Sequence, residues 1–502
     1  MQSSGNFSRS ANVLRSPCVA LAGRRSGIVT AMPLPLPTPA MPGPHLLFSS
    51  HLRRLASLRL TTLEHNLRLI APWVEKKRGE GSMADTLANG EHAAFRMLDL
   101  TAANPVARED PYPRLAELRA QCPLHRDEAA GAWLVGRMAD ARAIFTDNSH
   151  AKNPDRAEPA AIAIRRRRST VPDGLAFPDD QRASMLELDG EEHARVRNPL
   201  VQALYARIAR FEPECLRIVD AALDRLDGRA EFDLMHELAE PVPVACIGSI
   251  LGVPRETLAT FRGWLNGIVQ TFNPNRTPED VAALVAASNG LAHYIRGRFD
   301  DAKNNPPDDL FGDMARAQMA GVRLSDTEIT YNIRGLLIAG NVTTTDLIGN
   351  AVSVLLTHPA QLQKLRADPS LWPNAVEEVL RYEAPVDFTW RIATHAEELS
   401  GCPVPSGAAL NVFIRAANRD EAAFPVADAF DVSRPRASRH LSFGGGAHIC
   451  PGAPLARMEA KHLVSRLFTR FPNLRLAEPD APPAWCRLPG FRGLETLPVR
   501  VD

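Results

Sequence analysis

The sequence lacks several features that would mark particular classes of protein. It has no excess of one charge, since 58 basic and 58 acidic side chains balance over 502 residues, whereas a dedicated nucleic-acid-binding protein needs a basic excess to displace counterions. Cysteine is scarce and odd in number, with seven residues. This excludes a disulfide scaffold and favours a reducing compartment, so we expect a cytoplasmic protein. No apolar run reaches the roughly 18–20 residues that span a bilayer, and we expect no transmembrane segment.

The charges that are present are unevenly placed, because residues 1–82 carry a net charge of +8. The same segment contains a proline-rich run at 32–44, which should be extended and solvated. Three interpretations are open: an arginine-rich targeting sequence, a surface amphipathic anchor, or translated sequence upstream of a working protein that begins at Met83. The residue order of a signal peptide is missing. We favour the third interpretation and predict a basic extension at 1–82 and a single domain at 83–502.

The rest of the sequence has the apolar spacing of helices. Apolar residues recur at three- and four-residue intervals over 112–300. The stretch 326–356 is apolar nearly all round in its middle, which predicts a central buried helix. Short alternating segments at 385–415 predict small sheets, and a last long helix is expected at 453–471. No regular alternation of strands and helices suggests a parallel sheet, so the predicted fold class is mainly α with small β-sheets.

The sharpest chemical signal is a glycine-rich loop at 443–452, which reads FGGGAHICPG. A cysteine that binds a metal must be a thiolate at neutral pH. Glycines let backbone amides approach the sulfur of Cys450, and the following helix places its positive dipole end nearby. One strong thiolate, without a second Cys or His at the spacing of a zinc site, suits haem iron. We therefore predict that Cys450 is a metal ligand.

This loop, continued by APLAR at 453–457, resembles the haem-binding signature of the cytochrome P450 family, Phe-Gly-x-Gly-x-His/Arg-x-Cys-x-Gly. Every fixed position of the signature is filled, by Phe443, Gly444, Gly446, His448, Cys450 and Gly452. The resemblance covers about residues 95–500 and is closest to the bacterial type without a membrane anchor. It implies the mainly helical P450 fold with one haem b, whose iron is held by Cys450 so that thiolate donation favours O–O cleavage.

Two further sets of residues match the family in order. Glu378 and Arg381 are three residues apart on one helix face and resemble the family's Glu-x-x-Arg pair, for which Arg434 is the matching third member. His193 and Arg197 also share a helix face. The resemblance implies that this second pair binds the haem propionates, and that Arg391 and His448 are further propionate contacts.

The predicted central helix carries AGNVTT at 339–344, which resembles the oxygen-activating stretch of the family. The resemblance implies that Ala339 lies against the haem, that Gly340 leaves room for oxygen, and that the hydroxyl of Thr343 supports its protonation. Family members usually have Asp or Glu immediately before this threonine. Here the position is Val342, which cannot relay protons.

Three alternatives for the missing acid are open. A water chain reached through Thr343 and Thr344 replaces it, or Asp346, one helical turn after Val342, takes its role. In the third alternative, oxygen activation is poor and the enzyme uses peroxide or has another task.

The resemblance implies a monooxygenase that inserts one atom of O2 into a small apolar organic substrate. Electrons would come from NAD(P)H through a separate ferredoxin and its reductase, for which Arg457 and Lys461 are candidate contacts, and we expect a monomer. A peroxygenase or another non-oxygenase haem-thiolate enzyme is the alternative, and a non-catalytic haem-binding sensor is the alternative from another class. Phe388 and Trp390 suggest an apolar pocket, and the run at 165–168 is interpreted as a solvated charge cluster.

Overall fold

The computed structural model describes residues 95–121, 123–162, 172–177, 183–273 and 276–502. These residues belong to a compact unit assigned to Ala93–Asp502. The predicted extension at 1–82, the start at Met83 and the arginine run at 165–168 lie outside the described residues, so the expectations about them stay predictions.

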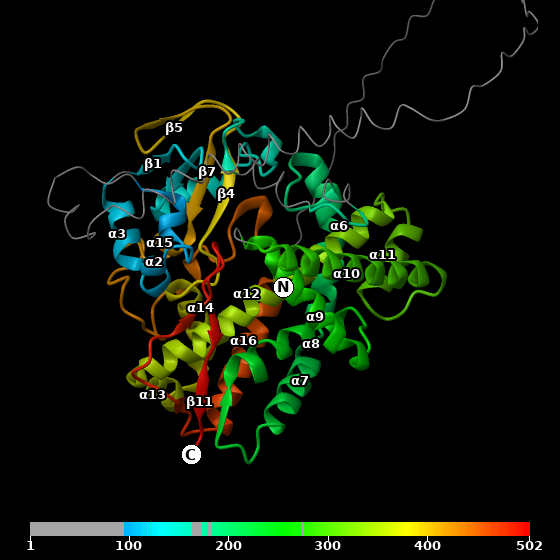
Figure 1. Ribbon diagram of the computed structural model, residues 1–502, viewed down its shortest axis with the longest axis vertical. Coiled ribbons are helices and arrows are strands. Elements are labelled where there is room, and N and C mark those ends of the chain that lie inside the picture. The colour runs from blue at the N-terminus through cyan, green and yellow to red at the C-terminus, as the bar shows by residue number, and fades with distance from the viewer. Residues whose placement is uncertain (1–94, 122, 163–171, 178–182, 274–275) are drawn as a thin grey trace, which may run out of the picture. The chain divides into compact units, whose positions relative to one another are not determined.

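Helices make up most of the described chain, which confirms the predicted fold class (Figure 1). The α-helices are α2 (Pro105–Glu109), α3 (Tyr112–Gln121), α4 (Met138–Thr146), α6 (Gly190–Ile208), α7 (Glu212–Asp224), α8 (Pro241–Ile250), α9 (Leu258–Val269), α10 (Pro278–Asn304), α11 (Leu310–Met319), α12 (Asp326–Thr357), α13 (Pro359–Ala367), α14 (Trp372–Tyr382), α15 (Ile414–Asn418) and α16 (Ala453–Arg470). Shorter turns include the π-helical η5 (Met235–Ala239) and the 3-10 turn η10 (Gly446–His448).

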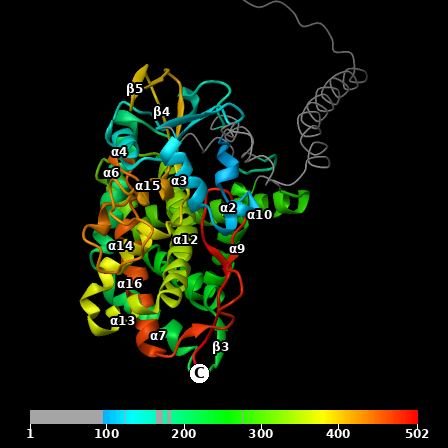
Figure 2. The same ribbon diagram turned by 90° about the vertical axis from the view of Figure 1, so that its left-hand side faces the viewer.

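The strands form small sheets at two ends of the described unit. They are β1 (Leu124–Asp127), β2 (Ala132–Val135), β3 (Glu231–Asp233), β4 (Phe388–Ile392), β5 (Glu397–Leu399), β6 (Cys402–Val404), β7 (Ala409–Phe413), β8 (Arg475–Leu476), β9 (Ala484–Trp485), β10 (Leu494–Thr496) and β11 (Pro498–Arg500). The largest sheet has the order β1-β2-β7-β4, in which only β2 and β7 are parallel. In Figures 1 and 2 this sheet lies at one end and β3-β11-β8 at the other.

The predicted central helix is observed as α12, which runs through the helical part with α16 beside it (Figures 1 and 2). It begins with a capping box in which the Ser325 side chain accepts from the backbone N–H of Glu328 while the Glu328 carboxylate accepts from the N–H of Ser325. It ends just before Pro359, which begins the next helix. The second half of α12 is buried on nearly every side, as the apolar pattern predicted.

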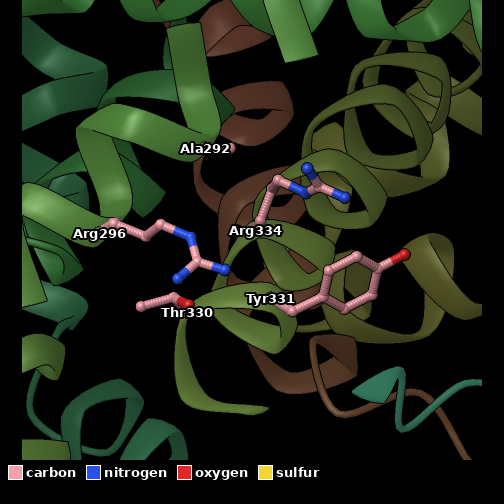
Figure 3. Close-up of a pocket in the computed structure, with 5 residues that line it drawn as sticks. All are labelled: Ala292, Arg296, Thr330, Tyr331 and Arg334. Atoms are coloured by element: carbon pink, nitrogen blue, oxygen red, sulfur yellow. The ribbon is translucent and has the colours of Figure 1, made fainter. Parts of the chain in front are cut away.

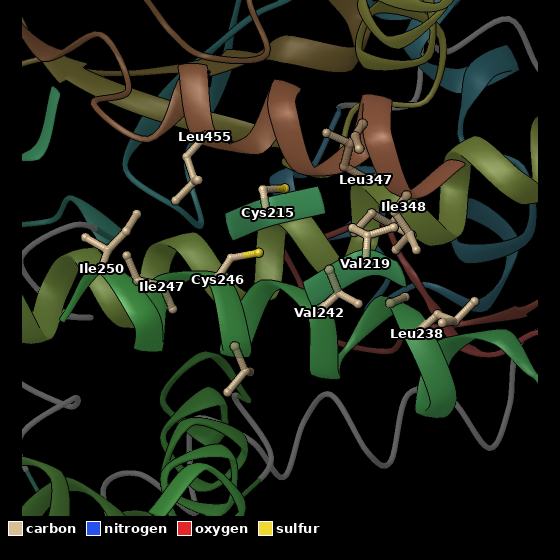
Figure 4. Close-up of a cluster of buried hydrophobic side chains, with 14 of the residues drawn as sticks. Cys215, Val219, Leu238, Val242, Cys246, Ile247, Ile250, Leu347, Ile348 and Leu455 are labelled. Atoms are coloured by element: carbon tan, nitrogen blue, oxygen red, sulfur yellow. The ribbon is translucent and has the colours of Figure 1, made fainter. Parts of the chain in front are cut away.

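The main core lies between α7, α8, α12 and α16. Figure 4 shows Cys215 of α7 and Cys246 of α8 among branched apolar side chains from these helices. Both cysteines are fully buried and free, so in this core they act as small apolar residues. A second buried cluster lies against the four-stranded sheet. The predicted site residues lie on α6, β4, α12 and the loop that precedes α16.

Candidate active site

The loop that carries Cys450 is shaped by its glycines. Gly444 and Gly446 have φ of +69° and +65°, a left-handed conformation that costs other residues energy. A Cβ on Gly446 would lie 1.9 Å from the backbone carbonyl oxygen of Phe145. The turn is closed by a hydrogen bond from the N–H of Cys450 to the carbonyl of Phe443, 2.9 Å long, and α16 begins three residues after the cysteine.

The surroundings of the Cys450 thiol act on its ionisation in opposite directions. Burial raises the pKa of Cys450 above its ordinary value. Hydrogen bonds from the N–H groups of Gly452 and Ala453 and the charges of Arg197 and Arg457 lower it in part. The balance favours the protonated thiol, and a metal cation bound to the sulfur would remove this proton. The backbone donors are already in place to stabilise the resulting thiolate.

Two predicted propionate ligands, His193 and His448, stack on each other. Their ring centroids are 4.0 Å apart with an angle of 28° between the planes. His448 faces the carboxylate of Asp189, with Nε2 and Oδ1 3.8 Å apart. The Nε2 of His193 is buried without a hydrogen-bond partner. Burial, then the charges of His448 and Arg197, lower the pKa of His193 to about 4, so its ring is neutral and one nitrogen needs a partner.

The two predicted arginine ligands contact the same loop at different residues. Arg197 of α6 donates to the carbonyl of Ile449, and Arg391 of β4 donates to the carbonyl of Gly445 at 3.3 Å. Burial lowers the pKa of Arg391 to about 10, and the guanidinium remains charged at neutral pH. The structure thus brings all four predicted propionate ligands to the Cys450 loop.

Sequence analysis missed Lys152, which is buried beside this cluster. Its Nζ donates to Oγ1 of Thr389 at 2.9 Å and to the carbonyl of Trp390 at 3.2 Å, and it lies 3.5 Å from the centre of the Trp390 ring. Burial, then the charge of Arg391, lower the pKa of Lys152 well below its usual value. A lone lysine in a loop has no periodic signal, so nothing in the sequence pointed to its burial.

The residues predicted on α12 divide between two faces. The Oγ1 of Thr343 donates to the carbonyl of Ala339 at 2.7 Å on the partly exposed side of the helix. A Cβ on Gly340 would meet nothing within 4 Å, so this side has free space. Thr344, the next residue, is buried on another side of the helix. Of the two predicted threonines, Thr343 alone is on the open side.

Asp346 faces the chain between β9 and β10. A Cβ on Gly493 would lie 1.8 Å from its Oδ1. Burial, then the negative charge of Asp387, raise the pKa of Asp346 to about 8. Asp387 is bonded to Arg415. The raised pKa favours the protonated form of Asp346 at pH 7, and the two residues that act on it, Gly493 and Asp387, come from segments distant in the sequence.

The Glu378–Arg381–Arg434 triad forms as the resemblance implied. Glu378 and Arg381 are both fully buried and joined by two bonds of 2.8 Å, and Nε of Arg434 donates to Oε1 of Glu378 at 3.0 Å. Arg381 also donates to the carbonyls of Asn418 and Ala427. The triad thereby fixes α14 to the loop that leads to the cysteine.

The predicted partner contacts are already paired. Arg457 makes two bonds to the Glu377 carboxylate, at 2.6 and 2.9 Å, and Nζ of Lys461 is 3.1 Å from Oε1 of Glu212.

The two aromatic residues proposed for the pocket are also in contact with other side chains. Phe388 packs in the core against Phe413, and Trp390 is covered by Lys152.

A small pocket lies between α10 and α12, away from these residues (Figure 3). It is lined by Ala292, Arg296, Thr330, Tyr331 and Arg334. Its lining on α12 ends six residues before Gly340, and none of the predicted site residues belongs to it. No helix in the described part of the chain is long and apolar enough to cross a membrane.

Comparisons with known proteins agree with this arrangement. Residues 166–485 match the family model of cytochrome P450. The chain is 37% identical to cytochrome P450 107B1 of Saccharopolyspora erythraea over 80% of its length and 98% of the relative. It is 34% identical to 6-deoxyerythronolide B hydroxylase of the same organism, over 78% and 96%. Among solved structures, epothilone B-bound cytochrome P450epoK has a TM-score of 0.73 and 31% identity, and the match covers 80% of this chain and 99% of that one.

The chain belongs to the cytochrome P450 family and is an oxidoreductase of its monooxygenase class. Membership implies a haem cofactor, and the described residues fit one. Arginine and histidine side chains gather beside the Cys450 loop, and hydrogen-bond donors of this kind suit the two haem propionates. The buried Nε2 of His193 has no hydrogen-bond partner, and Asp189 faces His448. The thiol of Cys450, with its backbone donors, suits the iron.

Proposed function

We propose that this enzyme inserts one atom of O2 into an apolar organic substrate, with electrons from NAD(P)H supplied by a separate ferredoxin and its reductase. The observation that carries the proposal is the open side of α12, where the hydroxyl of Thr343 lies beside the free space at Gly340. This side of the helix is the one that the family places opposite the cysteine loop.

Different residues of the chain would bind the haem and support oxygen activation. Cys450 would hold the iron, His193, Arg197, Arg391 and His448 would hold the propionates, and haem b would supply the activation of dioxygen. The hydroxyl of Thr343 donates a hydrogen bond at the open side of α12, where it could hold a proton close to bound oxygen. Its present bond to the carbonyl of Ala339 orients the hydroxyl.

A role for Asp346 in proton supply, in place of the acid missing at Val342, is one hypothesis, in which the proton must pass from the packed side of α12, where Asp346 faces Gly493, to the open side at Thr343. A carboxylic acid whose pKa is about 8 keeps its proton at neutral pH and can release it close to the operating pH. The alternative is a water chain through Thr343 and Thr344. An Asp346→Asn variant separates them: the fraction of NADPH converted into product should fall with Asp346 as donor, and should stay at the wild-type value with a water chain.

An apolar substrate is supported by the residues next to β4. Val386 pairs with Phe491, whose ring packs edge-on against that of Phe272 at 4.8 Å, and Phe272 is 40% exposed. Apolar and aromatic lining is typical of pockets for small molecules. Separate electron carriers are supported by the sequence, because the cysteines of the described residues are not spaced for an iron–sulfur cluster.

The first test is an optical titration of the purified, haem-loaded chain against a panel of apolar compounds. The panel begins with 6-deoxyerythronolide B and epothilones, the compounds named for the relatives. We expect a saturable high-spin shift with one chemical class, followed by incorporation of one labelled oxygen atom from O2 in the presence of NADPH, ferredoxin and reductase. Failure to bind haem would overturn the assignment of Cys450.

A peroxygenase is the second candidate, favoured by Val342 alone. Turnover with peroxide that exceeds turnover with the reconstituted electron donors would establish it. If the chain binds haem and a ligand but shows no turnover with peroxide or with the electron donors, a haem-binding sensor remains as the function.

A further inference from the structure

A group of metal-binding side chains lies outside the site described above. Asp147 follows the C-terminal end of α4, His150 follows it by three residues, and Glu397 begins β5. One ligand atom from each lies within 4.8 Å of the other two. The His150 side chain is 1% exposed, and its Nδ1 has no hydrogen-bond partner. A buried nitrogen without a partner is costly, so its orientation needs an explanation.

The hydrogen bonds around His150 define its tautomer. Its Nε2 lies 2.7 Å from Oε1 of Glu397, and because an ionised carboxylate only accepts, Nε2 carries the hydrogen. In the neutral ring the lone pair is then on Nδ1, which faces Oδ2 of Asp147 at 3.7 Å. This distance is too long for a hydrogen bond. With the ring in its neutral form, two electron-rich atoms face each other across this gap.

The gap has the size and chemistry of a metal site. Zinc binds nitrogen and oxygen ligands at about 2.0–2.2 Å, which places two tetrahedral ligand atoms roughly 3.3–3.5 Å apart. A metal-binding histidine typically donates its other ring N–H to a carboxylate, as His150 does to Glu397. Ser149 donates to the carboxylate of Asp147 through its backbone N–H, at 2.8 Å from Oδ1, and through its side chain.

We infer that Asp147, His150 and Glu397 form a binding site for a divalent first-row transition metal ion, with Zn²⁺ as the best fit. The metal ligands are Nδ1 of His150 and the Asp147 carboxylate. Glu397 orients the His150 ring and adds a second negative charge near the ion. Water molecules occupy the remaining coordination positions, which face solvent. Mixed nitrogen and oxygen donors favour zinc over magnesium or calcium. The side chain of Asp147 is 45% exposed, so the ion has a path from solvent.

Metal binding at this site would join the segment after α4 to the β5 strand. Phe145, whose carbonyl lies against Gly446, is in the last turn of α4 just before this segment, and the segment itself contains Ala151, which pairs with Ile392 next to Arg391. The ion would therefore stabilise the part of the chain that supports the Cys450 loop. This inference does not depend on the proposed reaction, because zinc binding is measured directly.

The test is calorimetric titration of the full-length, haem-loaded chain, free of any added histidine tag, with zinc chloride alone. We expect one saturable site per chain and a rise in the unfolding temperature with zinc. Asp147→Asn should abolish the site, and this exposed residue can be changed without disturbing the fold, which an unchanged haem spectrum would verify. Glu397→Gln should weaken binding by about 10- to 100-fold.

The matched control is His236→Ala. His236 is an exposed histidine whose Nδ1 lies 3.0 Å from Oδ1 of Asp233, so it represents a surface histidine–carboxylate pair without a third group. It should leave the zinc site unchanged. Zinc binding by Asp147→Asn with wild-type stoichiometry and affinity, or no saturable site in the wild-type chain, would overturn the inference.

Discussion

Gly446 occupies a position where any side chain would collide with the backbone of α4. We predict that Gly446→Ala prevents stable haem incorporation, because the added Cβ would lie 1.9 Å from the carbonyl oxygen of Phe145 and the cysteine loop must move to avoid it. The measurement is the ratio of haem to protein after purification.

Gly228→Ala is the matched control for this change. Gly228 has φ of +79°, and a Cβ there meets nothing within 4 Å, so alanine adds only the strain of the left-handed conformation, about 1–2 kcal/mol. It should keep a normal haem content. Equal haem content in both variants would show that the contact with Phe145 does not fix the loop.

Asp346 makes the stability of the fold depend on pH. Its pKa is raised from 3.8 to about 8 in the folded chain, mainly by burial and then by Asp387. Between these two values the folded state holds a proton that the unfolded state has released, so stability falls as pH rises from about 4 to about 8 and levels off above it. The slope approaches about 1.4 kcal/mol per pH unit.

We predict that Asp346→Asn, which mimics the neutral acid, reduces this fall. The measurement is the unfolding free energy at several pH values between 5 and 9, for both proteins in the same haem-loaded state. Asp387 and Cys486 are the other titratable groups facing Asp346. An identical pH dependence in the two proteins would assign the effect to other groups.

At the scale of elements, α12 presents chemistry on one side and packing on the others. We predict that Thr343→Val lowers the fraction of NADPH converted into product several-fold, with the electrons lost to reduced oxygen, because the hydroxyl on the open side is removed. Thr345→Val is the matched control. The hydroxyl of Thr345 is buried and unpartnered, so its removal should be neutral or stabilising and should leave coupling unchanged.

The sequence predicted elements well where one local pattern determines them. The glycine spacing at 443–452 identified the cysteine loop, and the apolar pattern at 326–356 gave α12 within a residue. The raised pKa of Asp346 could not be predicted from the sequence, because it results from contacts with Gly493 and Asp387, which lie on distant segments. The burial of Lys152 likewise depends on its contact with Trp390. The spacing of apolar residues along the chain does not predict such long-range contacts.

At the scale of the whole molecule, Glu378 connects parts that are far apart in the chain. It bonds Arg381 on its own helix and Arg434 in the loop toward Cys450, and it accepts from the backbone N–H of Asp431. We predict that Glu378→Gln destabilises the protein by about 3–5 kcal/mol, the typical effect of removing one partner of a buried ion pair. Two buried guanidinium groups would lose their charge partner.

Thermal unfolding and haem retention on heating measure this effect. Glu192→Gln is the control, since its side chain is 64% exposed and its bond to Arg195 is on the surface, where such pairs contribute about 0–1 kcal/mol. Similar unfolding temperatures for both variants would show that the triad does not hold the fold together.

The buried cationic side chains of Arg391 and Lys152, beside the Cys450 loop, also have a consequence for the protein in a cell. Without the two carboxylates of haem, these groups repel one another in a buried place, and ligand binding relieves that repulsion and shifts the folding equilibrium. Chains without haem should therefore be less stable than haem-loaded chains. We expect the amount of this enzyme in a cell to follow haem availability, with chains that receive none removed by proteolysis.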